Sequence, residues 1–353
     1  MAYIGSANCR NESENQGMSK VLSIIIAAYN VEAYLDNTLH SCVMGDCRLQ
    51  GDYEVIVVND GSRDGTLAIA NQYAQQWPEV FRVIDKHNGG YGSVINVGIE
   101  AAEGKYFKLL DGDDWYDVQA LAELIWRLRS CDSDMVLTNY VMVHEGSGRR
   151  EVFKYAELEQ EKLLPPSELW KLSRPLAMHG ICYKTDILRK MPVPITEHCF
   201  YTDTEYVIYG LAYVKSVTYY PLDLYQYRIG LEGQSVSPTG LERHIGDLER
   251  VIAGIETFHD QLQDGNNKDL VSYRIAMSYR GYYTSLLLLP GSREVRQKIK
   301  IFDERIKAQQ PERYRWMENK KFRILRGVLR ATGYRAYGLC AHYYRWEKKR
   351  DER

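Results

Sequence analysis

The sequence predicts an α/β fold, with a mostly parallel central sheet flanked by helices and a helical C-terminal extension. In the first third of the 353 residues, apolar runs rich in Val and Ile alternate with segments of helical spacing. The first run, KVLSIIIAAYN at 20–30, is nearly continuous, as in a parallel strand covered on both faces. Such runs end near residues 29, 59, 85 and 110, which is the rhythm of βα units.

The remaining elements are predicted from the same periodicities. After the first strand, the expected helices and strands alternate, at 31–43, 53–60, 64–77, 80–86, 92–104 and 105–111. A helix begins at 118, and a strand at 134–143 runs into the charged turn HEGSGRR, which indicates a hairpin. The second half predicts a helix at 201–214, a strand and turn at 216–230, and long helices at 241–264, 267–289 and 292–309.

Composition places the chain among ordinary globular proteins, with 45% apolar and 26% charged residues. The net charge of −2 hides an asymmetry, because residues 313–353 hold 13 Lys or Arg and only 4 Asp or Glu. Seven cysteines form no C-x-x-C pair, which favours a reducing compartment, and no apolar run is long enough to span a bilayer. Residues 1–19 lack the apolar core of a signal peptide and are expected to be a disordered leader. We therefore expect a cytoplasmic protein.

Each predicted parallel strand is followed by a polar cluster. These clusters are Tyr29-Asn30, Asp60-Gly61-Ser62, the segment Lys86–Ser93, and Asp111-Gly112-Asp113-Asp114. Ligands of open parallel sheets bind outside the carboxyl ends of the strands. Four such clusters on one edge predict a binding site there.

The acidic cluster is suited to a hard divalent cation. Two carboxylates about 5 Å apart repel by roughly 3 kcal/mol at an effective dielectric of 20. Mg²⁺ or Mn²⁺ bound by Asp111, Asp113 and Asp114 would offset that repulsion and neutralise a diphosphate. The alternative is a solvated turn whose last Asp caps the next helix.

The other clusters also have two interpretations. VVNDGSRDGT fits a capped strand-to-helix turn, and it also gives Asp60 a carboxylate that can accept a hydrogen bond from a base. KHNGGYGSVIN is not a dinucleotide fingerprint, since Ile95 stands where the third Gly is needed, and the chain has no P-loop motif. Its glycines let the backbone approach a ligand closely, beside Lys86, whose charge suits phosphate.

Together, SIIIAAYN, VIVVNDGSRDGT, KHNGGYGSVINVGIEAAEGKYFKLLDGDDW and FYTDTEY resemble the family-2 glycosyltransferases of the GT-A fold. The match is specific through about 20–120, weaker to about 235 and absent beyond. The resemblance implies transfer of a sugar, with inversion, from a nucleotide-sugar that is usually a UDP-sugar. It also implies a GT-A domain at 20–235, with a nucleotide-binding part at 20–115 and an acceptor part at 116–235. The helical patterns beyond it predict a helical region at 236–312.

The resemblance assigns roles to individual residues. Asp111, Asp113 and Asp114 occupy the family's DxD position, where they would bind the metal and the donor diphosphate. The expected nucleotide-sugar site consists of Ala28, Tyr29, Glu32, Asp60, Lys86, Asn88, Gly89, Gly90, Ser93, Asp111, Asp113 and Arg228. Arg228 or Ser235 would cover the donor from a loop.

An inverting transfer needs a base that takes the acceptor hydroxyl's proton. In YTDTEY, Thr202 replaces the Glu of the family's usual Glu-Asp pair, while Asp203 matches. We expect Asp203 to be the base, with Glu205 as its rival. The alternative role for Asp203 is capping of the helix that starts there.

The basic tail, 313–353, places Phe322, Leu325 and Leu329 on one helical stripe, beside a stripe of Arg323, Arg326 and Arg330. This pattern suits a helix that lies on an anionic membrane through 320–350, at the inner face of the plasma membrane. The same pattern fits a basic helix that packs on the protein's own acidic body or on a partner subunit.

The leading hypothesis is a metal-dependent glycosyltransferase that adds one sugar to a saccharide or lipid-linked acceptor, in polysaccharide or glycolipid synthesis. The processive Q-x-x-R-W motif is absent. A sugar nucleotidyltransferase is the alternative enzyme, but AAYNVEAY lacks the Gly-rich loop that it needs after the first strand. A non-catalytic nucleotide- or carbohydrate-binding protein is the third hypothesis. Nucleic acid is not an expected partner.

Overall fold

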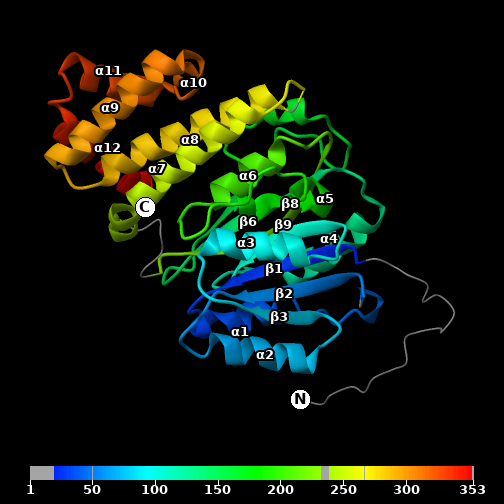
Figure 1. The fold of residues 1–353 in the computed structure, drawn as a ribbon. Coiled ribbons are helices and arrows are strands. Elements are labelled where there is room, and N and C mark those ends of the chain that lie inside the picture. Colours follow the sequence, from blue (N-terminus) through cyan, green and yellow to red (C-terminus); the bar gives the residue numbers. More distant parts are fainter. Residues whose placement is uncertain (1–19, 50, 232–237, 266, 352–353) are drawn as a thin grey trace. The chain divides into compact units, whose positions relative to one another are not determined.

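The computed structural model describes residues 20–49, 51–231, 238–265 and 267–351 (Figure 1). The predicted leader at 1–19 and Ser235 lie outside the described residues. The chain divides into two compact units. Unit 1 comprises the chain through Glu197 together with Val214–Ile229, and unit 2 comprises His198–Tyr213 together with the chain from Gly230 onward.

Unit 1 is built on one sheet with the strand order β3-β2-β1-β4-β8-β6-β9-β5, and β7 pairs with β6. The strands are β1 (Leu22–Ala28), β2 (Tyr53–Asn59), β3 (Phe81–Asp85), β4 (Tyr106–Asp111), β5 (Trp115–Tyr116), β6 (Met135–His144), β7 (Arg150–Phe153), β8 (Ile181–Lys184) and β9 (Val217–Ile229). The first four strands are parallel, and β8 joins β4 in antiparallel orientation. The expected mostly parallel sheet is therefore confirmed for this half.

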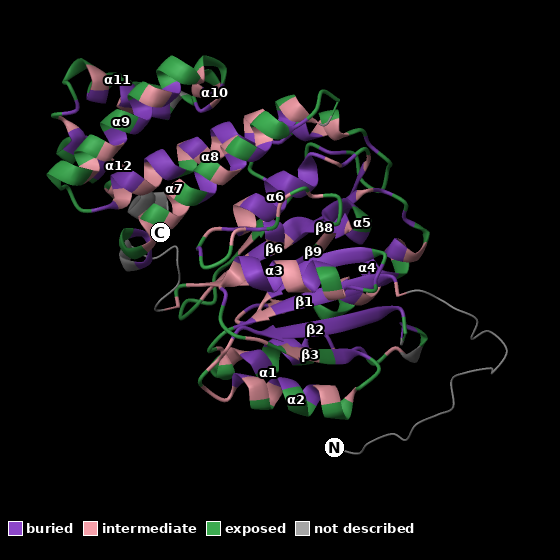
Figure 2. Ribbon diagram, viewed as in Figure 1, coloured by how far each residue is buried: buried purple, intermediate pink, exposed green. Residues whose placement is uncertain are grey.

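Three helices connect the parallel strands, α1 (Glu32–His40), α2 (Thr66–Gln76) and α3 (Tyr91–Ala101). The chain moves from β1 to β2 to β3 in one direction and returns to β4 in the other. Right-handed crossovers therefore place α1 and α2 on one side and α3 on the other, as Figure 1 shows. Figure 2 shows β1 and β2 buried along their length, which explains their continuous apolar sequence.

The rest of unit 1 completes the sheet. The predicted hairpin forms between β6 and β7, and β9 runs parallel to β6 with a register shift around Asn139. Helix α4 (Val118–Ser130) packs against β9, and Asp117 caps it by accepting a hydrogen bond from the Ala120 N–H. The expected cap, formed by the last Asp of the acidic stretch, is therefore confirmed at Asp117. The short strands β5 and β8 and the one-turn helix α5 (Thr185–Leu188) were not predicted.

Unit 2 is helical, as the C-terminal extension was expected to be. Its helices are α6 (Asp203–Leu211), α7 (Pro238–Gln261), α8 (Lys268–Leu288), α9 (Arg293–Gln309), α10 (Pro311–Trp316), α11 (Lys320–Ala331) and α12 (Tyr337–Asp351). Helix α8 is central, since it contacts α6, α7, α9, α10 and α12. None of the helices in the described part of the chain is long and apolar enough to cross a membrane.

The basic stripe of the tail packs inside unit 2. Phe322 and Leu329 are buried, and the Phe322 ring lies 4.9 Å from the Tyr283 ring of α8. Arg326 and Arg330 form ion pairs with Asp303 of α9. For these four side chains the structure therefore shows packing on the protein's own body, whereas Arg323 is exposed, and contact of the tail with a membrane stays a prediction.

Candidate functional site

The four polar clusters meet at one edge of the sheet, as predicted. In the strand registers, Ala28 pairs with Asn59, Asn59 with Asp85, and Ala27 with Asp111. The strand order reverses at β1, because β2 lies on one side of it and β4 on the other. This is the position at which open α/β sheets bind ligands.

Asp60 is not a free carboxylate, which corrects the expectation that its side chain has no partner until a nucleotide base binds. Its side chain is buried and accepts hydrogen bonds from the Lys86 ammonium, the Asn88 amide and the backbone N–H groups of Gly89 and Gly90. An ionised carboxylate offers about four acceptor positions. Asp60 therefore holds the loop between β3 and α3 in place, with its acceptor positions already in use.

Backbone segments of the protein lie close together at this loop, whereas the predicted approach of its backbone to a ligand stays a prediction. Gly61 has φ 72°, and a Cβ added there would lie 2.9 Å from the Asn88 nitrogen. A Cβ on Gly89 would lie 2.6 Å from the Ser93 hydroxyl oxygen. Ser93 in turn accepts a hydrogen bond from the Lys86 ammonium, 2.8 Å away. Lys86, Asn88, Gly89, Gly90 and Ser93 therefore form one network around Asp60.

The turns after β1 and β2 are tied to each other. The Asn30 side chain accepts a hydrogen bond from the Arg63 N–H, and Glu32 accepts one from the Gly65 N–H at the start of α2. Ala28 is buried, whereas Tyr29 is 48% exposed. Of the four residues expected to line a nucleotide pocket, Tyr29 and Glu32 are therefore the exposed ones, and the flat ring of Tyr29 could stack on a base.

The acidic cluster is organised by tyrosines. The Tyr91 hydroxyl donates a hydrogen bond to Asp111 over 2.7 Å, and the Tyr225 hydroxyl donates one to Asp114, also over 2.7 Å. Asp114 is fully buried and accepts a second bond from the Arg228 N–H. Burial, with Asp111 and Asp113 nearby, raises the pKa of the Asp114 carboxyl well above its ordinary value. The cluster thus has an excess of negative charge that a cation would offset.

The structure groups Asp111 and Asp114 with His179. One ligand atom from each of these three side chains lies within 4.8 Å of the other two. Two carboxylates and an imidazole suit Mn²⁺, and within the described residues His179 Nδ1 has no hydrogen-bond partner. These residues therefore fit a divalent metal. The carboxylate of Asp113 lies outside this group, so its assignment as a ligand stays a prediction.

Arg228 lies beside the cluster on strand β9, not on a loop as expected, and its role in covering the donor stays a prediction. Its Nε donates to the Asp113 carbonyl over 3.0 Å, and its Nη1 pairs with Glu145. The guanidinium lies 4.7 Å from the centre of the Trp115 ring and 5.2 Å from that of Tyr34. These contacts place its positive charge at the carboxyl end of β4.

Comparison with known proteins decides the family. Residues 23–191 match the family described as Glycosyl transferase family 2. The chain carries a glycosyltransferase family 2 domain. It is 29% identical to EpsH of Bacillus subtilis (strain 168), a protein named as a glycosyltransferase, over 79% of this chain and 81% of EpsH. It is 32% identical to the glycosyltransferase EpsJ of the same organism, over 43% of this chain and 42% of EpsJ.

Solved structures show that this glycosyltransferase has the expected GT-A fold. Residues 1–349 of S. aureus TarS, in complex with UDP-GlcNAc, superpose with a TM-score of 0.67 at 20% identity, over 93% of this chain and 92% of that one. The mannosyltransferase PcManGT of Pyrobaculum calidifontis, in complex with GDP-Man and Mn²⁺, gives a TM-score of 0.52 at 14% identity, over 94% and 88% of the two chains.

The two base candidates of this glycosyltransferase lie in unit 2, on the first turn of α6. The N-cap of α6 is Thr202, so Asp203 is not the capping residue. Burial raises the pKa of the Asp203 carboxyl. Glu205 is fully buried, its carboxylate forms a hydrogen bond with Tyr209, and a Cβ on Gly254 of α7 would lie 3.0 Å from it. Glu205 is therefore enclosed by its own unit.

Sequence reasoning missed His179, Tyr91 and Tyr225. His179 lies in LAMHGICY, which has neither metal-ligand spacing nor a clear periodicity. It reaches the cluster because the unpredicted strand β8 follows it and pairs with β4. A signal existed for Tyr225, since YQYRI alternates tyrosines at period two and so points them to one face of a strand.

Proposed function

We propose that this glycosyltransferase is metal-dependent and transfers one sugar from a nucleotide diphosphate sugar to an acceptor hydroxyl, with inversion. The observation that carries the proposal is the group of Asp111, Asp114 and His179 at the carboxyl end of β4. A divalent metal bound there would neutralise the diphosphate as it leaves. Arg228, whose guanidinium lies beside the same cluster, would add a second positive charge.

A UDP-sugar is the favoured donor class. TarS, which shares the fold, was solved with UDP-GlcNAc and with UDP, and GalNAc-T7 with UDP and Mn²⁺. In this chain the exposed ring of Tyr29 would stack on the base at the end of β1. Asp60, together with the loop of Lys86, Asn88, Gly89, Gly90 and Ser93, would form the floor beneath the nucleotide.

Asp203 would act as the base that takes the proton from the acceptor hydroxyl. Its raised pKa makes it a better proton acceptor than an ordinary Asp at neutral pH. The backbone just before it is strained, because His198 has φ 49° and Tyr201 has φ 64°. Strain of this kind is concentrated at functional sites. The enclosure of Glu205 favours Asp203 further.

The acceptor would be a saccharide or a lipid-linked saccharide of a cell-surface polymer. A relative in Bacillus subtilis, 38% identical over 26% of this chain, is named as the minor teichoic acid biosynthesis protein GgaB. Work on such an acceptor would take place at the cytoplasmic face of the membrane. Contact through 320–350 stays a prediction. Its exposed large apolar side chains are Ile324, Val328, Leu339, Tyr343 and Trp346.

A donor screen followed by a transfer assay tests the proposal. Thermal shifts are measured with a panel of nucleotide-sugars, with and without Mn²⁺, and release of the nucleotide is then followed with the stabilising donor. We expect release that needs Mn²⁺ and that falls by about 100-fold or more in Asp111→Asn. Release that is unaffected by EDTA would remove the metal from the mechanism. A protein that binds UDP but never releases it from any donor would be a binding protein.

A further inference from the structure

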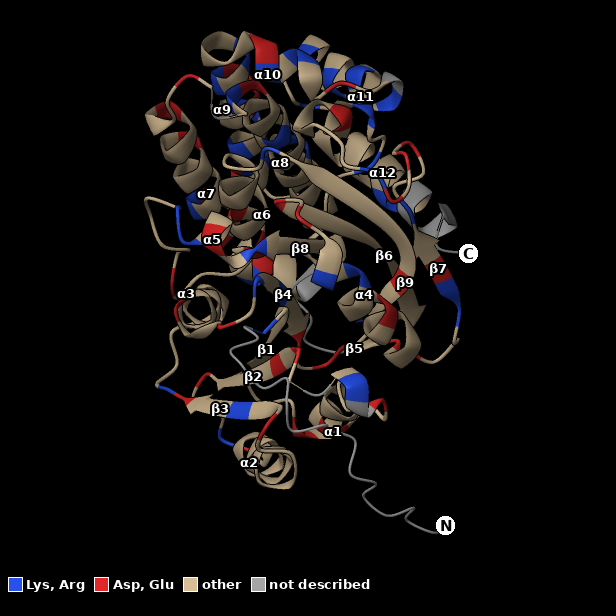
Figure 3. Cartoon of the chain, turned by 90° about the vertical axis from the view of Figure 1, so that its right-hand side faces the viewer, with Lys and Arg blue, Asp and Glu red and all other residues tan. Residues whose placement is uncertain are grey.

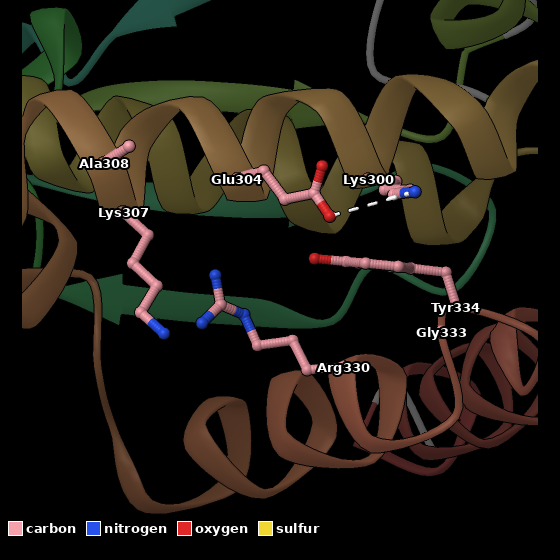
Figure 4. A pocket seen from close by; sticks show the side chains of 7 residues that line it. All are labelled: Lys300, Glu304, Lys307, Ala308, Arg330, Gly333 and Tyr334. Atoms are coloured by element: carbon pink, nitrogen blue, oxygen red, sulfur yellow. Dashed lines mark ion pairs between the residues drawn. The ribbon is translucent and has the colours of Figure 1, made fainter.

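Unit 2 contains a cavity that the transfer reaction does not use. It lies between α9 and the end of α11, has a volume of about 550 Å³ and is lined by Lys300, Glu304, Lys307, Ala308, Arg330, Gly333 and Tyr334 (Figure 4). We call it the α9–α11 pocket. Figure 3 shows Lys and Arg recurring along α11, whose last turn contributes Arg330. The pocket is thus lined by side chains from two basic segments.

Positive charge in the pocket is only partly neutralised. Asp303 is buried beneath it and is shared by Arg326 and Arg330, and Glu304 pairs with Lys300 over 3.9 Å. Lys307 forms no ion pair with any residue that the structure describes. The four cations Lys300, Lys307, Arg326 and Arg330 therefore face two carboxylates, which leaves two positive charges in excess.

Lys307 and Arg330 converge, although Arg330 is paired with Asp303. Figure 4 shows the Lys307 ammonium and the Arg330 guanidinium turned toward each other across the cavity. Asp303 holds Arg330 in a fixed direction, because Nε donates to its carboxylate and Nη2 to its carbonyl, and Nη1 is the nitrogen not bonded to Asp303. Like charges that point at one another are unfavourable unless an anion lies between them. A fixed Arg fork and a nearby Lys suit the oxygens of a phosphate group.

The C-terminal end of α11 lies beside the pocket. The last carbonyls of α11 are already bonded, because the N–H groups of Thr332, Gly333 and Tyr334 donate to Val328, Arg330 and Leu329. The Tyr334 hydroxyl also donates a hydrogen bond to the Asp303 carboxylate over 2.6 Å, so that this carboxylate is already bonded within the protein. The carboxylate that an entering anion would meet is therefore Glu304 alone.

We propose that the α9–α11 pocket binds a phosphate group carried by the acceptor. The assignment to the acceptor rests on the proposed function, whereas the preference for phosphate rests on the pocket itself. The pocket belongs to the same unit as Asp203, the residue proposed to activate the acceptor. An acceptor that carries a phosphodiester or phosphate ester would thus be selected over an uncharged saccharide.

Calorimetry with the full chain at about 0.15 M ionic strength tests this, since surface charge alone is then largely screened. The probes are inorganic phosphate, a short glycerol-phosphate oligomer, and vesicles of phosphatidylglycerol or phosphatidylcholine. Lys307→Glu is compared with Arg296→Glu, which makes the same charge change at an exposed position of α9 outside the pocket. We expect the oligomer to bind the wild type. It should bind Lys307→Glu about tenfold more weakly, and it should bind Arg296→Glu with nearly unchanged affinity.

Three outcomes overturn the proposal: no binding of oligomer or phosphate, equal weakening by both substitutions, or binding to phosphatidylglycerol vesicles without binding to the soluble esters. The last result would assign the phosphate to a lipid headgroup instead of the acceptor. UDP affinity, measured in parallel, should be unchanged in both variants. Absence of UDP binding in all three proteins would contradict the proposed function while leaving the result on the pocket intact.

Discussion

The imidazole of His179 is kept neutral by its surroundings. Burial and, to a lesser extent, the ammonium of Lys108 together lower the pKa of His179 to about 3. The ring stacks on Tyr227 with centroids 4.3 Å apart, and Lys108 Nζ donates to the His179 carbonyl over 2.9 Å. A neutral imidazole is the form that binds a metal, so the fold prepares this residue for ligation.

The same burial makes His179 a source of acid instability. Its folded-state pKa of about 3 lies below the ordinary value of 6.5, so its contribution to stability is present above pH 6.5 and is lost as the pH falls toward 3. Between pH 7 and pH 5, without metal, the wild type should lose about 2 kcal/mol more unfolding free energy than His179→Gln. Urea titrations at both values measure this difference, with His342→Gln, at an exposed histidine of α12, as the control. Parallel losses in wild type and His179→Gln would contradict this account of His179.

At the scale of elements, the site depends on the loop between β3 and α3 being held against the turn after β2. The hydrogen bonds of Asp60 and the close approach of Gly61 to Asn88 provide that link. Because each strand contributes only its end, the loops must be fixed for the clusters to form one site.

Gly61→Ala tests this link against Gly146→Ala, since both glycines have positive φ, 72° and 80°, but only Gly61 is crowded. Each substitution should cost about 1–2 kcal/mol of stability through backbone strain. Only Gly61→Ala should also weaken UDP binding, by about tenfold, because the added Cβ displaces Asn88 and with it the loop. Calorimetric UDP titrations and urea unfolding separate the two effects. Equal UDP affinities in the two variants would show that this loop does not shape the donor site.

The elements of the first half could be predicted because each is encoded locally. Continuous Val and Ile runs give β1 and β2, and the spacing of Leu35 and Leu39 gives α1. Most of the polar groups of the site could then be predicted from the sequence, because they directly follow the ends of these strands. His179 could not be found this way, because a lone His carries no periodicity and its position depends on how β8 pairs with β4. The two-residue strand β5 is likewise too short to produce a pattern.

At the scale of the whole molecule, the proposed roles divide between the two units. The metal group, the Asp60 network and Arg228 belong to unit 1, and Asp203 belongs to unit 2. Sequence periodicity does not reveal this division, since α6 lies between segments of unit 1 in the chain but is grouped with the C-terminal helices. Contacts between residues that are distant in the sequence determine which unit α6 belongs to.

This division predicts that binding and transfer can be separated by mutation. Asp203→Asn should leave UDP affinity unchanged and reduce transfer by about 100-fold or more, because only the proton acceptor is removed. Glu205→Gln is the comparison on the same turn, and it should lower stability more than it lowers transfer per folded molecule. UDP titrations, transfer assays and urea unfolding of both variants provide the data. Unchanged transfer in Asp203→Asn would move the base elsewhere.

The fall in the transfer rate at low pH should also depend on the protonation of Asp203. Since its pKa is raised, the carboxylate is lost as the pH falls through a value above the ordinary 3.8. The rate at saturating donor should therefore decline toward low pH earlier than an ordinary Asp would cause. A pH profile of the transfer rate measures this fall, and its disappearance in Asp203→Asn would assign it.

The central claim is that Asp111, Asp114 and His179 bind a cation that in turn binds the donor diphosphate. Anomalous diffraction from a crystal soaked with Mn²⁺ and UDP tests it directly. We expect one manganese peak among these three side chains, in contact with the diphosphate oxygens. Manganese bound elsewhere, or UDP bound at this edge of the sheet with no metal beside it, would contradict the account.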